Sequence, residues 1–310
     1  MKRKALVIGA TGLLGYGITK ELYKKGWNVR AIGRENLISS SIFPEGIEYI
    51  CGDFFDETFL KAALEGVEKV YFFISTTFPT TSVNSLELEI SRTLSGLDYL
   101  LRMMRDTGVN DLVFPSSGGT VYGDVEYGSA KEEDLLKPTI PYGVGKMMCE
   151  DLLHYYSQFG ISSTILRVGN VYGSPLARTT SQGVIDVFVQ KALKGEFATV
   201  WGNSLTSIRD YIFMDDFSEA VVRIGEYESK GVEVYNLSSG IGTELGEIIQ
   251  LINKYSAKPL RVKYVTDNVT SSIRRIVLDM AKFKEKTGWE MKFDIDKGIA
   301  ETVHRKQYME

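Results

Sequence analysis

The stretch from Lys4 to Gly15 reads KALVIGATGLLG, and it decides the fold class. Its apolar run, Ala5–Ile8, predicts a buried strand, while Leu14 and Ile18 begin a pattern with helical spacing. Three glycines therefore lie at a strand-to-helix turn, where a side chain would hold the backbone away from a phosphate. The free N–H groups and the dipole of the helix start favour an anion there. The turn predicts a site for a dinucleotide pyrophosphate, and a tight turn without a ligand is the alternative.

Composition is that of a soluble, nucleotide-using enzyme. The 310 residues are 44% apolar, enough for a substantial core, and acids and bases are mixed along a chain of net charge −4. That balance requires neither nucleic acid nor a charged membrane as a partner. Cys51, Cys149, His154 and His304 are scattered, which predicts a reducing compartment and no metal site.

A cytoplasmic location is expected from the same sequence. Lys2-Arg3-Lys4 precedes an apolar run, as in a signal peptide, but glycines interrupt the run and no small-residue cleavage site follows. The apolar stretches are also too short to span a bilayer, so we expect no membrane partner.

Strands and helices alternate along the chain to about residue 170. This rhythm predicts an α/β fold, a doubly wound parallel sheet of the Rossmann type whose ligands lie beyond the carboxyl ends of the strands. The expected strands are Ala5–Ile8, Asn28–Ile32, Glu48–Cys51, Val70–Ile74, Leu112–Phe114 and Ser163–Arg167. The expected helices of this region include Thr58–Leu64, Leu86–Arg105 and Val144–Phe159.

Beyond Val168 the pattern becomes irregular. Loops rich in Gly, Ser and Thr separate short helices such as Gly183–Leu193 and Leu245–Tyr255. We therefore expect an NAD(P)-binding domain over residues 1–169 and a smaller C-terminal substrate-binding domain over residues 170–310. Part of the second region, about residues 210–240, is expected to pack back on the first domain.

The end of the second strand bears on the choice between NAD and NADP. NAD sites usually place an acid there, whereas a nearby arginine accommodates the extra phosphate of NADP. Arg34 and Glu35 offer one of each, so NAD is expected and NADP stays possible; a solvated charge pair is the alternative. Asp53, just past the third strand, is positioned either to bond the adenine or to cap the next helix.

Acid/base chemistry is predicted from a tyrosine and a lysine one helical turn apart. Tyr-x-x-x-Lys places phenol and ammonium on one helix face, where the cation favours the phenolate. The pattern occurs three times, at Tyr16–Lys20, Tyr127–Lys131 and Tyr142–Lys146. Only Tyr142, after Pro141 at a helix start and downstream of a Ser-Ser-Gly-Gly-Thr-Val-Tyr-Gly segment, is placed to face a cofactor at the sheet edge.

These residues, in this order, resemble the extended short-chain dehydrogenase/reductase superfamily. Within it they are most similar to the NAD-dependent epimerase/dehydratase family, typified by UDP-glucose 4-epimerase, and the resemblance covers nearly the whole chain. It rests on Gly9-x-x-Gly12-x-x-Gly15, Asp53, the segment 116–123, Tyr142-x-x-x-Lys146, the segments 167–173 and 201–203, and Arg209-Asp210-Tyr211 leading to Asp215-Asp216.

The resemblance implies specific roles. Tyr142 would be the acid/base, Lys146 would hold the nicotinamide ribose, and Asn170 and Arg209 would grip a substrate diphosphate. The second diphosphate cation would be Arg274 or Arg275. We expect catalysis at Tyr142, Lys146, Ser117, Ser116 and Thr120. Expected cofactor contacts are Gly9, Thr11, Gly12, Leu13, Leu14, Gly15, Arg34, Asp53, Phe54, Ile74, Ser75, Thr76, Tyr142, Lys146 and Val168. Expected substrate contacts are Thr77, Asn170, Gln182, Arg209, Arg274 and Arg275.

Two departures from the family pattern concern the sugar. The family commonly places Ser or Thr four residues before Tyr122, to bond the sugar 4-hydroxyl, but this chain has Gly118. Ser117 or Thr120 must take that role, or the bond is absent. The proton-carrying Asp and Glu of the dehydratases are replaced by Gly119 and Thr120, so 4,6-dehydration lacks its acid and base.

The expected function is a nucleotide-sugar 4-epimerase that uses bound NAD for transient C4 oxidation of an NDP-hexose. The alternatives are an NAD(P)H-dependent reductase of NDP-4-keto-6-deoxyhexoses, which Arg34 and Gly118 favour, and a non-catalytic NAD(P)-sensing protein. A sensing protein would be expected to lack Tyr142 or Lys146, and both are present.

A homodimer is expected from two apolar helix stripes, as the resemblance also implies. One stripe, on the expected helix Leu86–Arg105, consists of Leu94, Leu97, Leu101 and Met104. The other, on the expected helix Val144–Phe159, consists of Met148, Leu152 and Tyr155. Pairing such helices across a two-fold axis would bury both stripes. The alternative is that both stripes pack only on the sheet.

Overall fold

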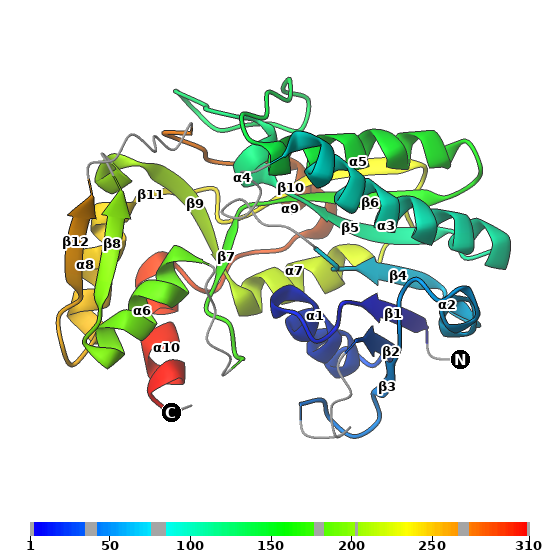
Figure 1. Cartoon of the computed structure of the whole chain (residues 1–310), viewed down its shortest axis with the longest axis horizontal. Coiled ribbons are helices and arrows are strands. Elements are labelled where there is room, and N and C mark those ends of the chain that lie inside the picture. The colour runs from blue at the N-terminus through cyan, green and yellow to red at the C-terminus, as the bar shows by residue number, and fades with distance from the viewer. Residues whose placement is uncertain are drawn as a thin grey trace. The chain divides into compact units, whose positions relative to one another are not determined.

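A seven-stranded sheet is the central element of the computed structural model (Figure 1). Its strand order is β10-β6-β5-β4-β1-β2-β3, and β1 to β6 pair in parallel. The strands are β1 (Lys4–Ile8), β2 (Asn28–Gly33), β3 (Glu48–Cys51), β4 (Lys69–Phe72), β5 (Asp111–Ser116), β6 (Ser162–Val168) and β10 (Val232–Leu237). This order confirms the doubly wound α/β fold, because strand order reverses direction beside β1.

The structure describes residues 3–34, 42–75, 85–176, 183–201, 204–265 and 273–308. It divides into two compact units. Unit 1 consists of residues 1–117, 140–167 and 218–235, and unit 2 consists of residues 118–139, 168–217 and 236–310. No helix within the described ranges is long and apolar enough to cross a membrane.

Helices of unit 1 follow the strands as the sequence predicts. They are α1 (Leu13–Lys24), α2 (Glu57–Leu64), α3 (Leu86–Thr107) and α5 (Pro141–Ser157). Ser85 begins α3 by accepting a hydrogen bond from the Leu88 N–H, and Gly108 ends it in the left-handed conformation. The predicted helix at Val144–Phe159 begins earlier, at Pro141, because proline suits the first turn, where its missing N–H costs nothing.

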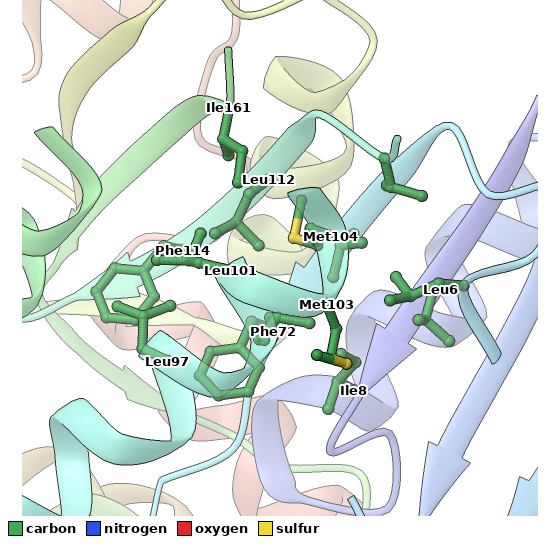
Figure 2. Packing of buried hydrophobic residues seen from close by; sticks show 14 of the residues in the cluster. Leu6, Ile8, Phe72, Leu97, Leu101, Met103, Met104, Leu112, Phe114 and Ile161 are labelled. Atoms are coloured by element: carbon green, nitrogen blue, oxygen red, sulfur yellow. The ribbon is translucent and has the colours of Figure 1, made fainter. Parts of the chain in front are cut away.

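The core of unit 1 lies between the sheet and α3 (Figure 2). Leu6 and Ile8 of β1, Phe72 of β4 and Phe114 of β5 are buried there. The helix contributes Leu97, Leu101, Met103 and Met104 to the same cluster. Close packing of these side chains holds α3 to one face of the sheet.

This core corrects part of the expected dimer interface. Leu97, Leu101 and Met104 of α3 are buried inside unit 1, so most of that stripe packs on the sheet and is not available to a second chain. In α5, Leu152 packs partly against the core, whereas Tyr155 is 52% exposed. Helical spacing identified an apolar face but could not say that the sheet covers it.

Unit 2 contains two smaller sheets. Its elements are α4 (Gly118–Val121), β7 (Asn170–Tyr172), α6 (Val184–Lys194), β8 (Phe197–Trp201), a 3-10 turn (Ser204–Thr206), β9 (Ile208–Phe213), β11 (Gly242–Glu244), α8 (Leu245–Tyr255), β12 (Arg261–Val265), α9 (Ala281–Thr287) and α10 (Ile295–Gln307). The strand orders are β11-β9-β7 and β12-β8, and α7 (Met214–Gly225) runs from unit 2 into unit 1. The helices predicted at Gly183–Leu193 and Leu245–Tyr255 are confirmed as α6 and α8.

Candidate active site

Backbone atoms approach one another closely at the glycine turn between β1 and α1. Gly9 has a φ of +83°, and a Cβ built on it would lie 2.9 Å from the Phe73 carbonyl group. A Cβ on Gly15 would collide with the Gly9 carbonyl oxygen, and the Gly12 N–H donates to that oxygen at 3.0 Å. Larger residues at these positions would force the turn open.

The start of α1 leaves its first N–H groups available to an anion. Its N-cap is Gly12, which makes no side-chain cap, so Leu13 and Leu14 begin the helix with uncapped N–H groups. Together with the bare Cα atoms of the turn, these groups form a cradle that fits the pyrophosphate of a dinucleotide.

Two more predicted cofactor residues lie beside this turn in unit 1. A Cβ on Gly33, the last residue of β2, would lie 3.1 Å from the Thr11 side chain, and Arg34 follows Gly33 directly at the exposed surface. Glu35, the acid that would favour NAD, lies outside the described residues.

The third strand leads into a turn at Asp53. Its carboxylate accepts the Phe55 N–H at 3.0 Å, and Asp56, not Asp53, caps α2 by accepting from the Phe59 N–H. The capping alternative for Asp53 is therefore wrong. The ring of Phe54 is buried in the core beside Phe72, which leaves only its backbone to approach a ligand.

Tyr142 and Lys146 lie on one face of α5. The Lys146 Nζ is 5.8 Å from the centre of the Tyr142 ring and donates to the Pro115 carbonyl at 2.8 Å. The Tyr142 hydroxyl is hydrogen-bonded to Ser75, in the segment that follows β4. Ser75 comes directly after Ile74, whose backbone would crowd a side chain on Gly9, so unit 1 brings the phenol and the glycine turn to one edge of the sheet.

Electrostatics at this pair differ from the expectation. Burial raises the pKa of the Tyr142 phenol, with Glu89 contributing in the same direction, and burial lowers the pKa of Lys146. The sequence predicted that the Lys146 cation favours the phenolate. In the structure desolvation is the largest influence, so the pKa of the phenol is raised and not lowered.

A buried ion pair that sequence reasoning missed holds Ser116. Its hydroxyl donates to the Glu150 carboxylate, which also accepts two arms of the Arg167 guanidinium, with Nη2 to Oε2 at 2.7 Å. Glu150 lies four residues after Lys146, and that helical spacing was the available signal. Since Ser116 is engaged, Ser117 and Thr120 stay the candidates for the role left open by Gly118.

Predicted substrate residues of unit 2 gather around β9. The Asn170 amide donates to the Asp210 carbonyl at 3.0 Å, and the Arg209 guanidinium donates to the carbonyls of Ile208, Ile273 and Arg274. Burial lowers the pKa of Arg209, yet an arginine stays charged. These carbonyls fix the direction of the guanidinium.

The two candidates for a second cation differ in their surroundings. Arg275 donates to the carbonyls of Val125 and Gly128, which holds it to the loop before α5 in the chain. The exposed side chain of Arg274 makes no hydrogen bond or ion pair with any residue of the described ranges. Arg274 is thus the cation better able to meet a ligand.

The remaining predicted contacts are placed as follows. Val168, at the end of β6, is buried, and Ile74 packs partly against the core of unit 1. Thr76, Thr77 and Gln182 lie outside the described residues.

Comparison with known proteins decides the family. A sequence model described as "NAD dependent epimerase/dehydratase family" matches residues 5–238, from β1 through β10. The chain belongs to the NAD-dependent epimerase/dehydratase family. The match spans the glycine turn, Tyr142, Lys146 and Arg209, whereas Arg274 and Arg275 lie beyond it.

Solved members of this family have the same fold. UDP-glucose 4-epimerase of Thermotoga maritima, crystallised with UDP-glucose, is 26% identical, with a TM-score of 0.88 over 98% of this chain and 99% of that one. UDP-glucose 4-epimerase of Thermus thermophilus, in complex with NAD, is 28% identical, with a TM-score of 0.86 and the same shares covered. The dTDP-4-dehydro-6-deoxyglucose reductase of Escherichia coli is 24% identical over 97% of both chains.

Replacing Gly12 by Val tests the cradle. We expect Gly12→Val to abolish NAD binding, because its Cβ would lie 3.2 Å from the Gly9 carbonyl oxygen and its methyl groups would occupy the phosphate position. Calorimetric titration with NAD measures the affinity, and Gly96→Ala, in the middle of α3, is the matched control. Equal affinities for Gly12→Val and wild type would contradict the assignment.

Proposed function

We propose that this protein is a nucleotide-sugar 4-epimerase that binds NAD and oxidises C4 of an NDP-hexose transiently. The observation that carries the proposal is the edge of unit 1, where the glycine cradle, Ser75, Tyr142 and Lys146 come together. Membership of the family and the likeness to UDP-glucose 4-epimerases solved with NAD and with UDP-glucose support it.

Tyr142 is the group that moves the proton in this proposal. The bound dinucleotide supplies the hydride acceptor and donor. The Tyr142 oxygen accepts the proton of the sugar 4-hydroxyl as C4 is oxidised and returns it when C4 is reduced. Burial raises the pKa of the phenol, so a cation close to its oxygen is needed to favour the phenolate that accepts this proton. Lys146, whose position on α5 is fixed by the Pro115 carbonyl, supplies part of that charge.

A diphosphate is the expected substrate anchor. Three backbone carbonyls accept from the Arg209 guanidinium and fix its orientation. The exposed side chain of Arg274, in the same unit, is the candidate for the second cation. Guanidinium groups match the oxygens of a diphosphate better than an ammonium does. UDP-glucose is therefore the first substrate to assay.

The nucleotide bound to the purified protein distinguishes an epimerase activity from a reductase activity. Denaturing the purified protein and identifying the released nucleotide is the deciding experiment. Tightly held NAD, together with conversion of UDP-glucose to UDP-galactose without net cofactor consumption, supports the epimerase. If the protein is purified without a nucleotide and oxidises NADPH in the presence of a 4-keto sugar, the epimerase proposal fails and the reductase takes its place. Arg34, Gly118 and the similarity to the Escherichia coli reductase favour that alternative.

Tyr142→Phe tests the acid/base role. Turnover should fall about 100- to 10,000-fold, because the hydroxyl that carries the proton is lost while the ring remains. NAD affinity and the melting temperature should stay near those of the wild type. Tyr127→Phe is the control, since Tyr127 belongs to the second Tyr-x-x-x-Lys match and is 81% exposed. A Tyr142→Phe enzyme with more than about a tenth of the wild-type rate would move the chemistry to another residue.

Arg209→Ala tests the substrate class. A charge-assisted bidentate contact contributes about 1.5–3 kcal/mol, so the KM for UDP-glucose should rise about tenfold or more while NAD affinity is unchanged. Arg209→Lys should recover only part of the loss, because it keeps the charge without the planar fork. Arg261→Ala, on the exposed strand β12 of the same unit, is the control. Wild-type binding of UDP-sugars by both Arg209 variants would refute the diphosphate assignment.

We also propose a cytoplasmic homodimer that pairs the outer faces of α3 and α5. These helices pack side by side in unit 1 (Figure 1). Tyr155, in the last turn of α5, and Phe159, just after the helix ends, are 52% and 47% exposed. Light scattering should give a two-chain mass at micromolar concentration. Tyr155→Glu should reduce it to one chain, because a buried, unpaired carboxylate is costly, and Leu135→Glu should not. A single-chain mass for the wild type would reject the dimer.

A further inference from the structure

Asp124 holds the backbone of the segment that carries Arg274. It comes directly after Gly123, at the end of the segment 116–123. Its Oδ1 accepts the N–H of Arg274 at 3.1 Å and the N–H of Arg275 at 2.8 Å. One carboxylate oxygen therefore joins two parts of unit 2 that lie 150 residues apart in the chain.

The carbonyl side of the same segment is held by β9. The Ile208 N–H donates to the Arg274 carbonyl at 2.8 Å. The Arg209 guanidinium donates to the carbonyls of Arg274 and Ile273 at 3.2 and 2.7 Å. Asp124 thus fixes Arg274 through its N–H, and β9 fixes it through its carbonyl. Because peptide groups are planar, fixing both of them sets the direction in which the side chain leaves the backbone.

The same bonds treat the two neighbouring arginines differently. The exposed side chain of Arg274 starts from the residue whose carbonyl the Arg209 guanidinium contacts. The Arg275 guanidinium instead donates to the carbonyls of Val125 and Gly128, in the loop that follows Asp124. Like charges repel each other, so two cations that start this close together favour an anion with several charged oxygens, as a diphosphate has.

We propose that Asp124 is a positioning residue of the diphosphate site, which holds the backbone at Arg274 so that Arg209 and Arg274 meet the same diphosphate. The inference rests on the proposed function, because it concerns the substrate anchor assigned to Arg209. Asp124 is itself an anion and repels a diphosphate, so its contribution to binding comes through the arginines.

Substitutions of Asp124 separate its hydrogen bonds from its charge. Asp124→Ala removes both, whereas Asp124→Asn removes the charge and keeps an oxygen that can accept both N–H groups. Asp134→Ala is the matched control, because Asp134 is an exposed acid of the same unit that accepts the Lys131 N–H, within its own turn, at 2.8 Å. Calorimetric titration measures the affinity for UDP, and kcat and KM are measured with UDP-glucose.

Asp124→Ala should weaken UDP binding about fivefold or more and raise the KM for UDP-glucose similarly, because the Arg274 backbone loses hydrogen bonds to a charged acceptor. The kcat and the NAD affinity should stay near those of the wild type, since Tyr142 and the glycine turn lie in unit 1. Asp124→Asn and Asp134→Ala should bind UDP nearly as the wild type does.

Positioning and charge predict opposite results for the alanine variant. If Asp124 acted only through its negative charge, Asp124→Ala and Asp124→Asn would both bind UDP more tightly than the wild type. Tighter binding by both variants, or wild-type binding by Asp124→Ala, overturns the proposal. If Asp124→Ala does not fold, Asp124→Leu carries the same test, because it keeps the shape of the side chain without its oxygen atoms.

A double variant shows whether Asp124 acts through the arginine. Arg274→Ala should weaken UDP binding by itself, and adding Asp124→Ala should weaken it further by less than Asp124→Ala does in the wild type. Losses that multiply in full would make Asp124 independent of Arg274 and would overturn the proposal.

UDP binding is measured without turnover, which keeps the role of Asp124 distinct from the epimerase assignment. If no nucleotide sugar is turned over but UDP binds, the proposed function fails and the UDP titrations still decide the role of Asp124. A wild-type protein that binds no UDP overturns this inference together with the diphosphate anchor.

Discussion

The buried carboxylate of Glu150 fixes the geometry on which the rest of the candidate site depends. It accepts from Ser116 at the end of β5 and from Arg167 in β6, while Lys146, one turn earlier on α5, donates to the Pro115 carbonyl. These bonds set the rotation of α5 about its axis. Desolvating an ion pair costs about as much as the pairing returns, so the pair contributes more to a unique arrangement than to stability. Tyr142, one turn before Lys146, is directed by the same bonds.

Around that fixed helix, burial and charge act against each other. Desolvation raises the pKa of Tyr142 and lowers the pKa of Lys146, so burial alone would make both groups neutral. Glu89 reinforces the first effect and opposes the second. Accepting the proton of a sugar hydroxyl requires the phenolate of Tyr142, so a cation beside the phenol must offset the effect of burial.

In unit 2, buried hydrogen bonds likewise fix charged side chains, here on the strand that carries an expected substrate residue. Asp210 is buried and accepts from the hydroxyls of Ser238 and Ser239 and from the Leu278 N–H, which ties β9 to the segments after β10 and before α9. Arg209 precedes it on the strand and is held by backbone carbonyls on the neighbouring segment. Guanidinium direction is then set by the fold, which reduces the side-chain entropy lost when an anion binds.

The sequence by itself determined the fold class, the glycine turn and the helix that carries Tyr142 and Lys146. Those features depend on local spacing: an apolar run before Gly9, helical periodicity after Gly12, and Pro141 at a helix start. It could not place Glu89, Glu150 or Arg167, because each lies far in sequence from the groups it contacts or reads as an ordinary charge on a helix or strand. Nor could it show that Leu97, Leu101 and Met104 face the sheet, that Asp56 rather than Asp53 caps α2, or that burial raises the pKa of Tyr142. Tertiary packing alone decided these points, because desolvation and pairing depend on what surrounds a side chain in space.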